Sequence, residues 1–176
     1  MNYYELYDLP VRFSVDEGQV KRKFYELSKA FHPDFHVNET PEKQQEILQL
    51  STENNKAYQV LSNPLKRIPY VLELHGLLEE GEKYQLPQSF LMDMMDVNEA
   101  LMELEFDPDP TVLETISKQV DGIERSLFDD LKAESDAFDA SSEPDRTSSL
   151  LRIKDIWFRQ KYLLRIRETL NRFASR

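Results

Sequence analysis

Three adjacent residues in the first quarter of the chain, His32, Pro33 and Asp34, have the side chains best suited to chemistry. A histidine beside a carboxylate could act as an acid–base pair in a hydrolase or bind a metal ion. The other two histidines, His36 and His75, do not complete a metal-binding spacing on one helix face. The sequence offers no nucleophile elbow, phosphate loop or paired metal motif to complete a site. We therefore expect no active site and no cofactor; a hydrolase using His32 and Asp34 is the enzymatic alternative.

Cysteine is absent from all 176 residues. Its absence excludes disulfides, thiolate metal sites, cysteine nucleophiles and a cysteine-ligated iron–sulfur cluster on this chain. The first ten residues lack a basic segment and a long apolar run, and no apolar stretch of about 18 residues occurs later. We therefore expect a cytoplasmic protein with no membrane partner.

The negative charge of the chain is concentrated in its second part. The net charge is −11 at pH 7, and residues 1–75 carry 9 basic and 11 acidic side chains. Residues 76–176 carry 13 basic and 22 acidic side chains. Contacts to nucleic-acid phosphates need a basic surface, so we expect no nucleic-acid partner.

The elements that position the tripeptide should be helices, because glycine is rare and 31% of the residues are charged. Ser14 followed three residues later by Glu17 is a capping-box pattern and predicts a helix over residues 15–31. Its apolar face consists of Val20, Phe24, Leu27 and Phe31. The residues that fall largely outside this face, and make the solvent side basic, are Lys21, Arg22, Lys23 and Lys29.

Pro33 must end this helix, because proline restrains the residue before it and cannot donate a backbone hydrogen bond. Residues 32–34 therefore occupy a loop. A second helix is predicted over residues 41–62, since the segment Thr40-Pro41-Glu42 is typical of a helix start. The two helices should form an antiparallel hairpin with the tripeptide in its loop.

A short helix over residues 65–75 should follow, because an Asn-Pro pair precedes it and Gly76 is a common stop. Pro69 lies within this helix and should cost it a hydrogen bond. Residues 77–86, with three glutamates and a glycine, are predicted to be a connector between modules. The first domain is therefore expected to span residues 1–76.

Three longer helices are predicted after the connector, and they should pack as a bundle over residues 87–176. The first ends before Asp107, and its buried face consists of Phe90, Met94, Val97, Leu101 and Leu104. The second sustains an apolar face from Leu113 to Phe138. After a polar loop over residues 139–147, the third spans about residues 148–174 with an apolar face that includes Leu150, Ile153, Trp157 and Leu164.

The first bundle helix carries more apolar residues than one buried face needs. Leu91, Met92 and Met95 lie off the predicted core face. Their acidic neighbours on that side are Asp96, Glu99 and Glu103. We therefore expect an exposed apolar patch with an acidic border, although flexible methionine side chains taken singly could be core filling.

The predicted hairpin resembles a J-domain. It has the tripeptide in its loop, a basic first helix, and a second helix that ends in Asn54-Asn55-Lys56-Ala57-Tyr58-Gln59-Val60-Leu61. The resemblance implies that the tripeptide contacts the nucleotide-binding half of a 70-kDa heat-shock chaperone and promotes ATP hydrolysis there, while the basic face steers docking. The chaperone-binding residues that it implies are His32, Pro33, Asp34, Lys21, Arg22 and Lys29.

Other segments resemble the HscB (Jac) family of co-chaperones for iron–sulfur cluster assembly, across nearly the whole chain. They are Tyr4-Glu5-Leu6-Tyr7-Asp8-Leu9-Pro10, residues 13–16, Asn63-Pro64-Leu65-Lys66-Arg67, the set Tyr70, Leu72, Leu74 and Gly76, and Phe90-Leu91-Met92. This resemblance implies an all-α, L-shaped adaptor in which a J-domain precedes a three-helix bundle.

The resemblance also implies two partners. The J-domain would stimulate the ATPase of a 70-kDa chaperone of the HscA or DnaK type, and the bundle would deliver an iron–sulfur scaffold protein of the IscU type to it. The implied scaffold-binding residues are Leu91, Met92, Met95, Asp96, Glu99, Glu103 and Phe158, whereas Trp157 is expected in the core. The alternative is a general protein-folding J-protein whose bundle binds other clients or a second copy of the chain.

Three positions depart from the family's pattern. Phe35 follows the tripeptide where a basic residue is usual, Pro69 replaces a small residue, and Asn98 stands where arginine is common. Phe35 bears on how the loop meets the chaperone, and Asn98 bears on the client contacts.

Overall fold

The computed structural model describes residues 1–144 and 146–175. Regular structure in these residues is helical, and no strand occurs among them, which confirms the predicted all-α fold. The chain divides into two compact units: unit 1 is Met1–Gly76 with Phe138–Ala140, and unit 2 is Leu77–Ala137 with Ser141–Arg176. None of the described helices combines the length and the apolar character that a membrane span requires.

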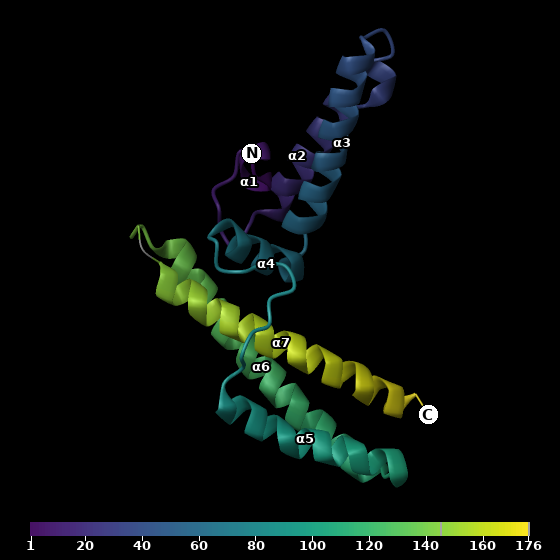
Figure 1. The fold of residues 1–176 in the computed structure, drawn as a ribbon, viewed down its shortest axis with the longest axis vertical. Helices are drawn as coiled ribbons and strands as arrows, with labels where there is room; N and C mark the ends of the chain where they lie inside the picture. Colours follow the sequence, from purple (N-terminus) through teal and green to yellow (C-terminus); the bar gives the residue numbers. More distant parts are fainter. Residues whose placement is uncertain (145, 176) are drawn as a thin grey trace. The chain divides into compact units, whose positions relative to one another are not determined.

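Unit 1 is built around a helical hairpin. Its elements are α1 (Tyr3–Leu6), α2 (Glu17–Ala30), the short 3₁₀ helix η1 (Pro33–Phe35), α3 (Pro41–Leu61) and α4 (Pro64–Leu74). α2 and α3 lie side by side, and α1 and α4 pack against α3 (Figure 1). The core between them includes Tyr4, Tyr7, Val20, Leu61 and Leu72, all without exposed surface.

The predicted capping box at Ser14 is wrong, because α2 begins at Glu17. The N-cap is Asp16, whose side chain accepts a hydrogen bond from the Gln19 N–H at 3.1 Å. Aspartate and serine are equally good N-caps, so the local pattern alone does not choose between them. Ser14 instead donates its N–H to an Asp139 carboxylate oxygen at 2.9 Å, a contact far away in sequence.

The starts of α3 and α4 follow the predicted signals. Thr40 caps α3 by accepting the N–H of Lys43 at 3.3 Å, and a proline occupies the first turn. Asn63 caps α4 by accepting the N–H of Leu65 at 3.0 Å. Pro69 lies inside α4, as predicted.

Asn54 fixes how α2 meets α3. Its side chain is buried, and its Oδ1 accepts the Tyr7 hydroxyl at 2.8 Å. Its Nδ2 donates to the Phe24 carbonyl and to the Ser28 Oγ, both at 3.1 Å. A buried amide with its donors and acceptor used tolerates only one register of the two helices.

Arg67 performs a similar role at the base of the hairpin. Its guanidinium donates from Nε to the Phe13 carbonyl at 2.7 Å and from Nη1 to the Leu61 carbonyl. Burial lowers the pKa of this guanidinium from its ordinary value. These two hydrogen bonds link α4 to the backbone carbonyls of Phe13 and Leu61.

A short segment near residue 140 completes the core of unit 1. Phe138 has no exposed surface and meets the Phe13 ring edge to face, with ring centroids 5.1 Å apart. The Asp139 carboxylate accepts the N–H groups of Phe13 and Ser14, each at 2.9 Å. Unit 1 is therefore discontinuous in sequence, and the polar loop predicted to begin at Asp139 begins later.

Unit 2 contains the three long helices α5 (Gln88–Phe106), α6 (Pro110–Ala140, to Ala137 within this unit) and α7 (Thr147–Ala174). They share one hydrophobic core (Figure 1). The five apolar residues predicted for the buried face of the first helix are all in that core: Phe90, Met94, Val97, Leu101 and Leu104.

Two predicted core residues of α7 lie elsewhere. Leu164 is 55% exposed, and Trp157 is only half-buried, with the Lys161 Nζ 4.5 Å from its ring centroid. The other predicted residues Leu150 and Ile153 are buried, together with Ile156 and Leu163. A helix with apolar residues around much of its circumference gives no clear choice of buried face from sequence.

Candidate functional site

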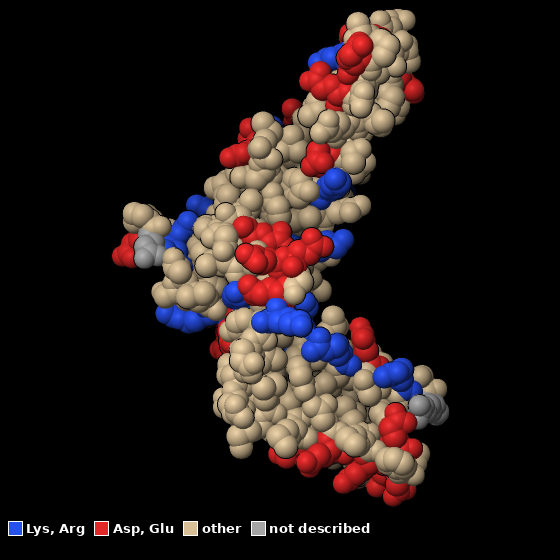
Figure 2. Space-filling model, in the orientation of Figure 1, with Lys and Arg blue, Asp and Glu red and all other residues tan. Residues whose placement is uncertain are grey.

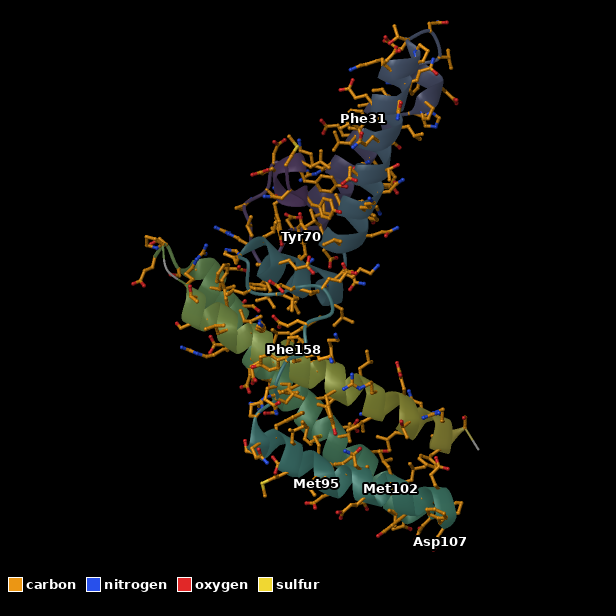
Figure 3. The ribbon with its side chains drawn as sticks, viewed as in Figure 1. Phe31, Tyr70, Met95, Met102, Asp107 and Phe158 are labelled. Carbon is orange, nitrogen blue, oxygen red and sulfur yellow. The ribbon has the colours of Figure 1, made fainter. Side chains whose placement is uncertain are left out.

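The tripeptide lies at the free end of the α2–α3 hairpin. α2 ends at Ala30, and Phe31 is its C-cap, which Figure 3 labels at this end of unit 1. Pro33 cannot continue the helix because it has no N–H. The chain makes one turn of 3₁₀ helix instead, in which the Phe35 N–H donates to the His32 carbonyl at 3.1 Å.

The loop is held by two side chains outside the tripeptide. The Nε2 of His36 lies 2.8 Å from the Ala30 carbonyl, so the ring is tied to the last turn of α2. Gln44, at the start of α3, donates its side-chain amide to the Val37 carbonyl at 3.1 Å and to the Glu39 carbonyl at 3.0 Å. The loop backbone is therefore fixed from both sides of the hairpin.

The side chains of the tripeptide remain open to a partner. The His32 and Asp34 side chains are 53% and 83% exposed. His32 Nδ1 accepts the Asp34 N–H at 3.2 Å, which leaves the neutral ring with its proton on Nε2. The ring nitrogen and the Asp34 Oδ2 are 3.6 Å apart. The pair offers one ring donor and one free carboxylate to an approaching surface.

The three basic residues predicted for chaperone docking are all exposed on α2: Lys21, Arg22 and Lys29. The neighbouring Lys23 is engaged within unit 1, because its Nζ donates to the Asp8 carboxylate at 2.6 Å. Lys21 and Lys29 are two turns apart on one face of the helix.

Tyr25 belongs to the same face and was missed from sequence. It stands four residues from both lysines and is 59% exposed. Aromatic rings with a polar tip are common in interfaces. The spacing alone could have indicated it, because i, i+4 and i+8 positions share a helix face.

The described residues contain no cluster of three or more His, Asp or Glu side chains arranged to hold a metal ion. His32 and Asp34 also lie on an open loop end, where water reaches both side chains. The arrangement suits recognition by a macromolecule better than general acid–base catalysis, which needs a positioned substrate.

A second exposed surface lies on α5 in unit 2. Met92 and Met95 are 61% and 56% exposed, whereas Leu91 is half-buried. The predicted acidic neighbours Asp96, Glu99 and Glu103 are all exposed. α5 contains no lysine or arginine, and Figure 2 shows acidic side chains along the edge that α5 forms.

The apolar part of this surface is longer than predicted. Met102 is 64% exposed and Phe106 is 89% exposed, in continuation of Met92 and Met95 along the helix. Figure 3 labels Met95 and Met102 on α5, with Asp107 just beyond its end. Residues 92, 95, 99, 102 and 106 follow the three-and-four spacing of one helix face, a signal that was available in the sequence. We call the four exposed apolar residues on this face, Met92, Met95, Met102 and Phe106, the α5 stripe.

Phe158 is held differently from the stripe. Its ring stacks on Tyr84, with centroids 4.4 Å apart and planes 9° from parallel. The Tyr84 hydroxyl donates to the Asp155 carboxylate at 2.7 Å, and burial, together with that carboxylate, raises the pKa of Tyr84 to about 12. Phe158 is half-buried, so a partner could contact only part of its ring.

Two of the departures from the family pattern have local roles. Asn98 donates its side-chain amide to the Tyr162 hydroxyl at 2.8 Å and so links α5 to α7. Phe35 is 68% exposed and meets the His32 ring edge to face, with centroids 5.8 Å apart. Phe35 therefore widens the surface of the loop beside the tripeptide.

Comparison with known families assigns each unit in turn. Residues 2–70 match the DnaJ domain, and residues 86–171 match the HSCB C-terminal oligomerisation domain. The chain belongs to the HscB family. The predicted resemblance is thereby confirmed: this is a J-domain co-chaperone of the family associated with iron–sulfur cluster assembly.

Two solved HscB structures resemble the whole chain. Chaperone HscB from Vibrio cholerae is 26% identical with a TM-score of 0.68, over 99% of this chain and 98% of that one. The human co-chaperone protein HscB is 26% identical with a TM-score of 0.71, over 97% of this chain and 81% of that one. In an HscB protein, the exposed tripeptide belongs to the J-domain and the α5 stripe to the C-terminal domain.

Proposed function

We propose that the protein stimulates the ATPase of a 70-kDa heat-shock chaperone of the HscA or DnaK type and delivers an IscU-type scaffold protein to it in the cytoplasm. The observation that carries this proposal is the pair of exposed surfaces of different chemistry, one on each family-matched unit. ATP turnover belongs to the chaperone, and this chain contributes recognition only.

The loop tripeptide is the chaperone-binding element of this proposal. Its side chains are exposed while its backbone is fixed by His36 and Gln44, so docking loses little conformational entropy. Lys21, Arg22 and Lys29 supply positive charge on the adjacent helix. Such charges raise the encounter rate with an acidic surface more than they raise affinity.

The scaffold-binding element is the α5 stripe with its acidic neighbours. Methionine side chains are flexible and polarizable, so Met92 and Met95 can adapt to an apolar partner surface. The helix has no basic residue to neutralise Asp96, Glu99 and Glu103. A scaffold that presents apolar side chains bordered by lysine or arginine would therefore complement it.

Carrying both elements on one chain raises the local concentration of scaffold around the bound chaperone. Client capture and ATP hydrolysis are then favoured together without any new contact between the partners. We expect the two effects to be synergistic rather than merely additive.

The direct test is steady-state ATP hydrolysis by a purified 70-kDa chaperone, with and without this protein and an IscU-type scaffold. Synergy that requires both proteins supports the proposal. Stimulation without any scaffold effect would favour a general protein-folding J-protein. Absence of stimulation with both an HscA-type and a DnaK-type chaperone would remove the proposed chaperone role.

Self-association is the second candidate for the α5 stripe. The matched C-terminal family is described as an oligomerisation domain, and the stripe is an exposed apolar face of the kind that a second copy can cover. Sedimentation velocity over a hundredfold concentration range distinguishes self-association from scaffold binding. If the protein is a monomer at every concentration, self-association is excluded and scaffold binding remains the proposed role of the stripe.

A further inference from the structure

A groove of about 370 Å³ opens at the free end of the hairpin, directly beside the tripeptide. Its walls come from the loop and from the first turns of α3, and include Pro33, Asp34, Val37, Ile47 and Leu48. Two members of the tripeptide therefore belong to the groove. Any surface that engages them also meets the groove.

Two of the four polar side chains that line the groove are already used. His36 and Gln44 both contribute to its walls, but their side chains bond to loop carbonyls within unit 1. The remaining lining is mostly apolar, with Ile47 buried to 5% exposure beneath it. An apolar side chain would fit against this apolar part of the lining, with Asp34 and Gln45 as its polar neighbours.

Apolar side chains also border the groove on its open side. Val37 and Leu48 belong to the lining and are 65% and 60% exposed, and Phe35, next to Asp34 in the loop, is 68% exposed. Figure 2 shows uncharged atoms over much of this end of the hairpin, with acidic and basic side chains beside them. A cluster of three such residues at a loop end is typical of an interaction surface rather than of a solvated helix.

We propose that this groove receives an apolar side chain of the 70-kDa chaperone, immediately next to the contact made by the tripeptide. The inference rests on the proposed function and deepens it, because it names a further contact with the same partner. The chaperone is the occupant because Pro33 and Asp34 are shared between the two contacts. A chaperone surface that covered the tripeptide alone would leave three large apolar side chains at the edge of its interface.

The groove and the basic face of α2 contribute to different rate constants. Lys21, Arg22 and Lys29 act at a distance, so their effect falls with added salt. Burial of an apolar side chain acts only after contact, so it slows dissociation and depends little on salt. The two contributions are therefore separable by experiment.

The test variant is Leu48→Ser, and the matched control is Leu65→Ser. Leu65 is on α4 outside the groove and is 66% exposed, close to the exposure of Leu48. Stimulation of HscA-type and DnaK-type chaperones is titrated with each variant at low and high salt. We expect Leu48→Ser to raise the concentration for half-maximal stimulation on the order of tenfold at both salt concentrations. Leu65→Ser should match the wild-type chain.

Each of the other outcomes contradicts the groove inference, the proposed function or both. If Leu48→Ser and the wild-type chain have the same titration curve, the groove inference fails while the chaperone role stands. If Leu65→Ser weakens stimulation equally, the effect is general and the groove inference again fails. If the wild-type chain stimulates neither chaperone, the proposed function fails and the groove inference fails with it. Unchanged melting temperatures of both variants exclude unfolding as the cause.

Discussion

His32 and Asp34 depend for their presentation on side chains that need not touch a partner. His36 and Gln44 fix the loop backbone, so that the tripeptide can stay exposed without being mobile. The same division holds deeper in unit 1, where Asn54 and Arg67 use buried hydrogen bonds to hold the hairpin together. The exposed residues are available to a partner, and the buried polar residues fix the position of the hairpin that carries them.

His32→Gln should abolish chaperone stimulation. The ring donor disappears, while the exposed position tolerates glutamine without a loss of packing. Stimulated ATP hydrolysis measures the effect, and scaffold binding by the same variant serves as the internal control. A large fall in melting temperature would show instead that His32 is structural.

Asn54→Ala should lower the free energy of unfolding by about 2–4 kcal/mol, because it leaves the Tyr7 hydroxyl and the Phe24 carbonyl buried without this partner. The matched control is Asn55→Ala, which removes an exposed amide from the next position of α3. Urea denaturation followed by circular dichroism measures both. Equal stability of the two variants would mean that the buried network contributes little.

At the level of elements, the sequence was most informative where proline and a polar cap stand together. α3 was predicted over residues 41–62 and spans Pro41–Leu61, and α7 was predicted from about 148 and begins at Thr147. The buried face of α5 was also predicted completely, because its members follow one another at alternating spacings of four and three residues. The buried face of α7 was predicted less well. Its apolar residues surround more of the helix, and the prediction wrongly placed the exposed Leu164 in the core.

The candidate site was only partly readable. The tripeptide, the basic residues and the exposure of Met92 and Met95 follow from local spacing. The groove beside the tripeptide does not, because it forms between a loop and a helix whose contact no periodicity encodes. The covering of Phe158 by Tyr84 is equally tertiary, since the two rings are far apart in sequence.

Asp16→Ala should destabilise unit 1 by about 1 kcal/mol through loss of the α2 N-cap. Ser14→Ala should change stability by less than about 0.5 kcal/mol, because the contact of Ser14 with Asp139 uses its backbone N–H. Thermal denaturation of both variants measures the difference. The reverse order would restore Ser14 as the cap.

Met92→Ser combined with Met95→Ser should weaken binding of an IscU-type scaffold at least about tenfold, because two exposed apolar contacts are lost. The melting temperature should stay within about 2 °C of the wild-type value, since neither side chain is in the core. Leu164→Ser on α7 is the control for an exposed apolar residue outside α5. Calorimetric titration reports the affinity, and equal affinity of both variants would remove the stripe from the interface.

At the scale of the whole molecule, each of the two units has its own core and its own exposed surface. In the structure, residues 138–140 belong to the same unit as residues 1–76. No sequence signal indicated this, because Phe138 continues the apolar periodicity of α6 and its partner Phe13 is far away in sequence. Substitutions in the tripeptide and in the α5 stripe should therefore have additive effects on the free energy of unfolding.

Phe138→Ala should lower the stability of unit 1 by about 3–5 kcal/mol, although it lies far beyond the J-domain match. The lost ring leaves a cavity beside Phe13 and His75, against which it packs edge to face. Phe128→Ala is the matched control, because Phe128 is on the same helix and 61% exposed. Hydrogen exchange of the α2 and α3 amides reports on unit 1 directly, and equal protection in both variants would contradict the prediction.

The discontinuity of unit 1 also sets an order of events during synthesis. Residues 1–76 leave the ribosome first, but the segment that contains Phe138 and Asp139 is complete only 64 residues later, counting from 76 to 140. At about 5–20 residues per second, the nascent J-domain waits roughly 3–13 s for the last pieces of its core. The chain thus completes unit 1 only after α5 and α6 have been made.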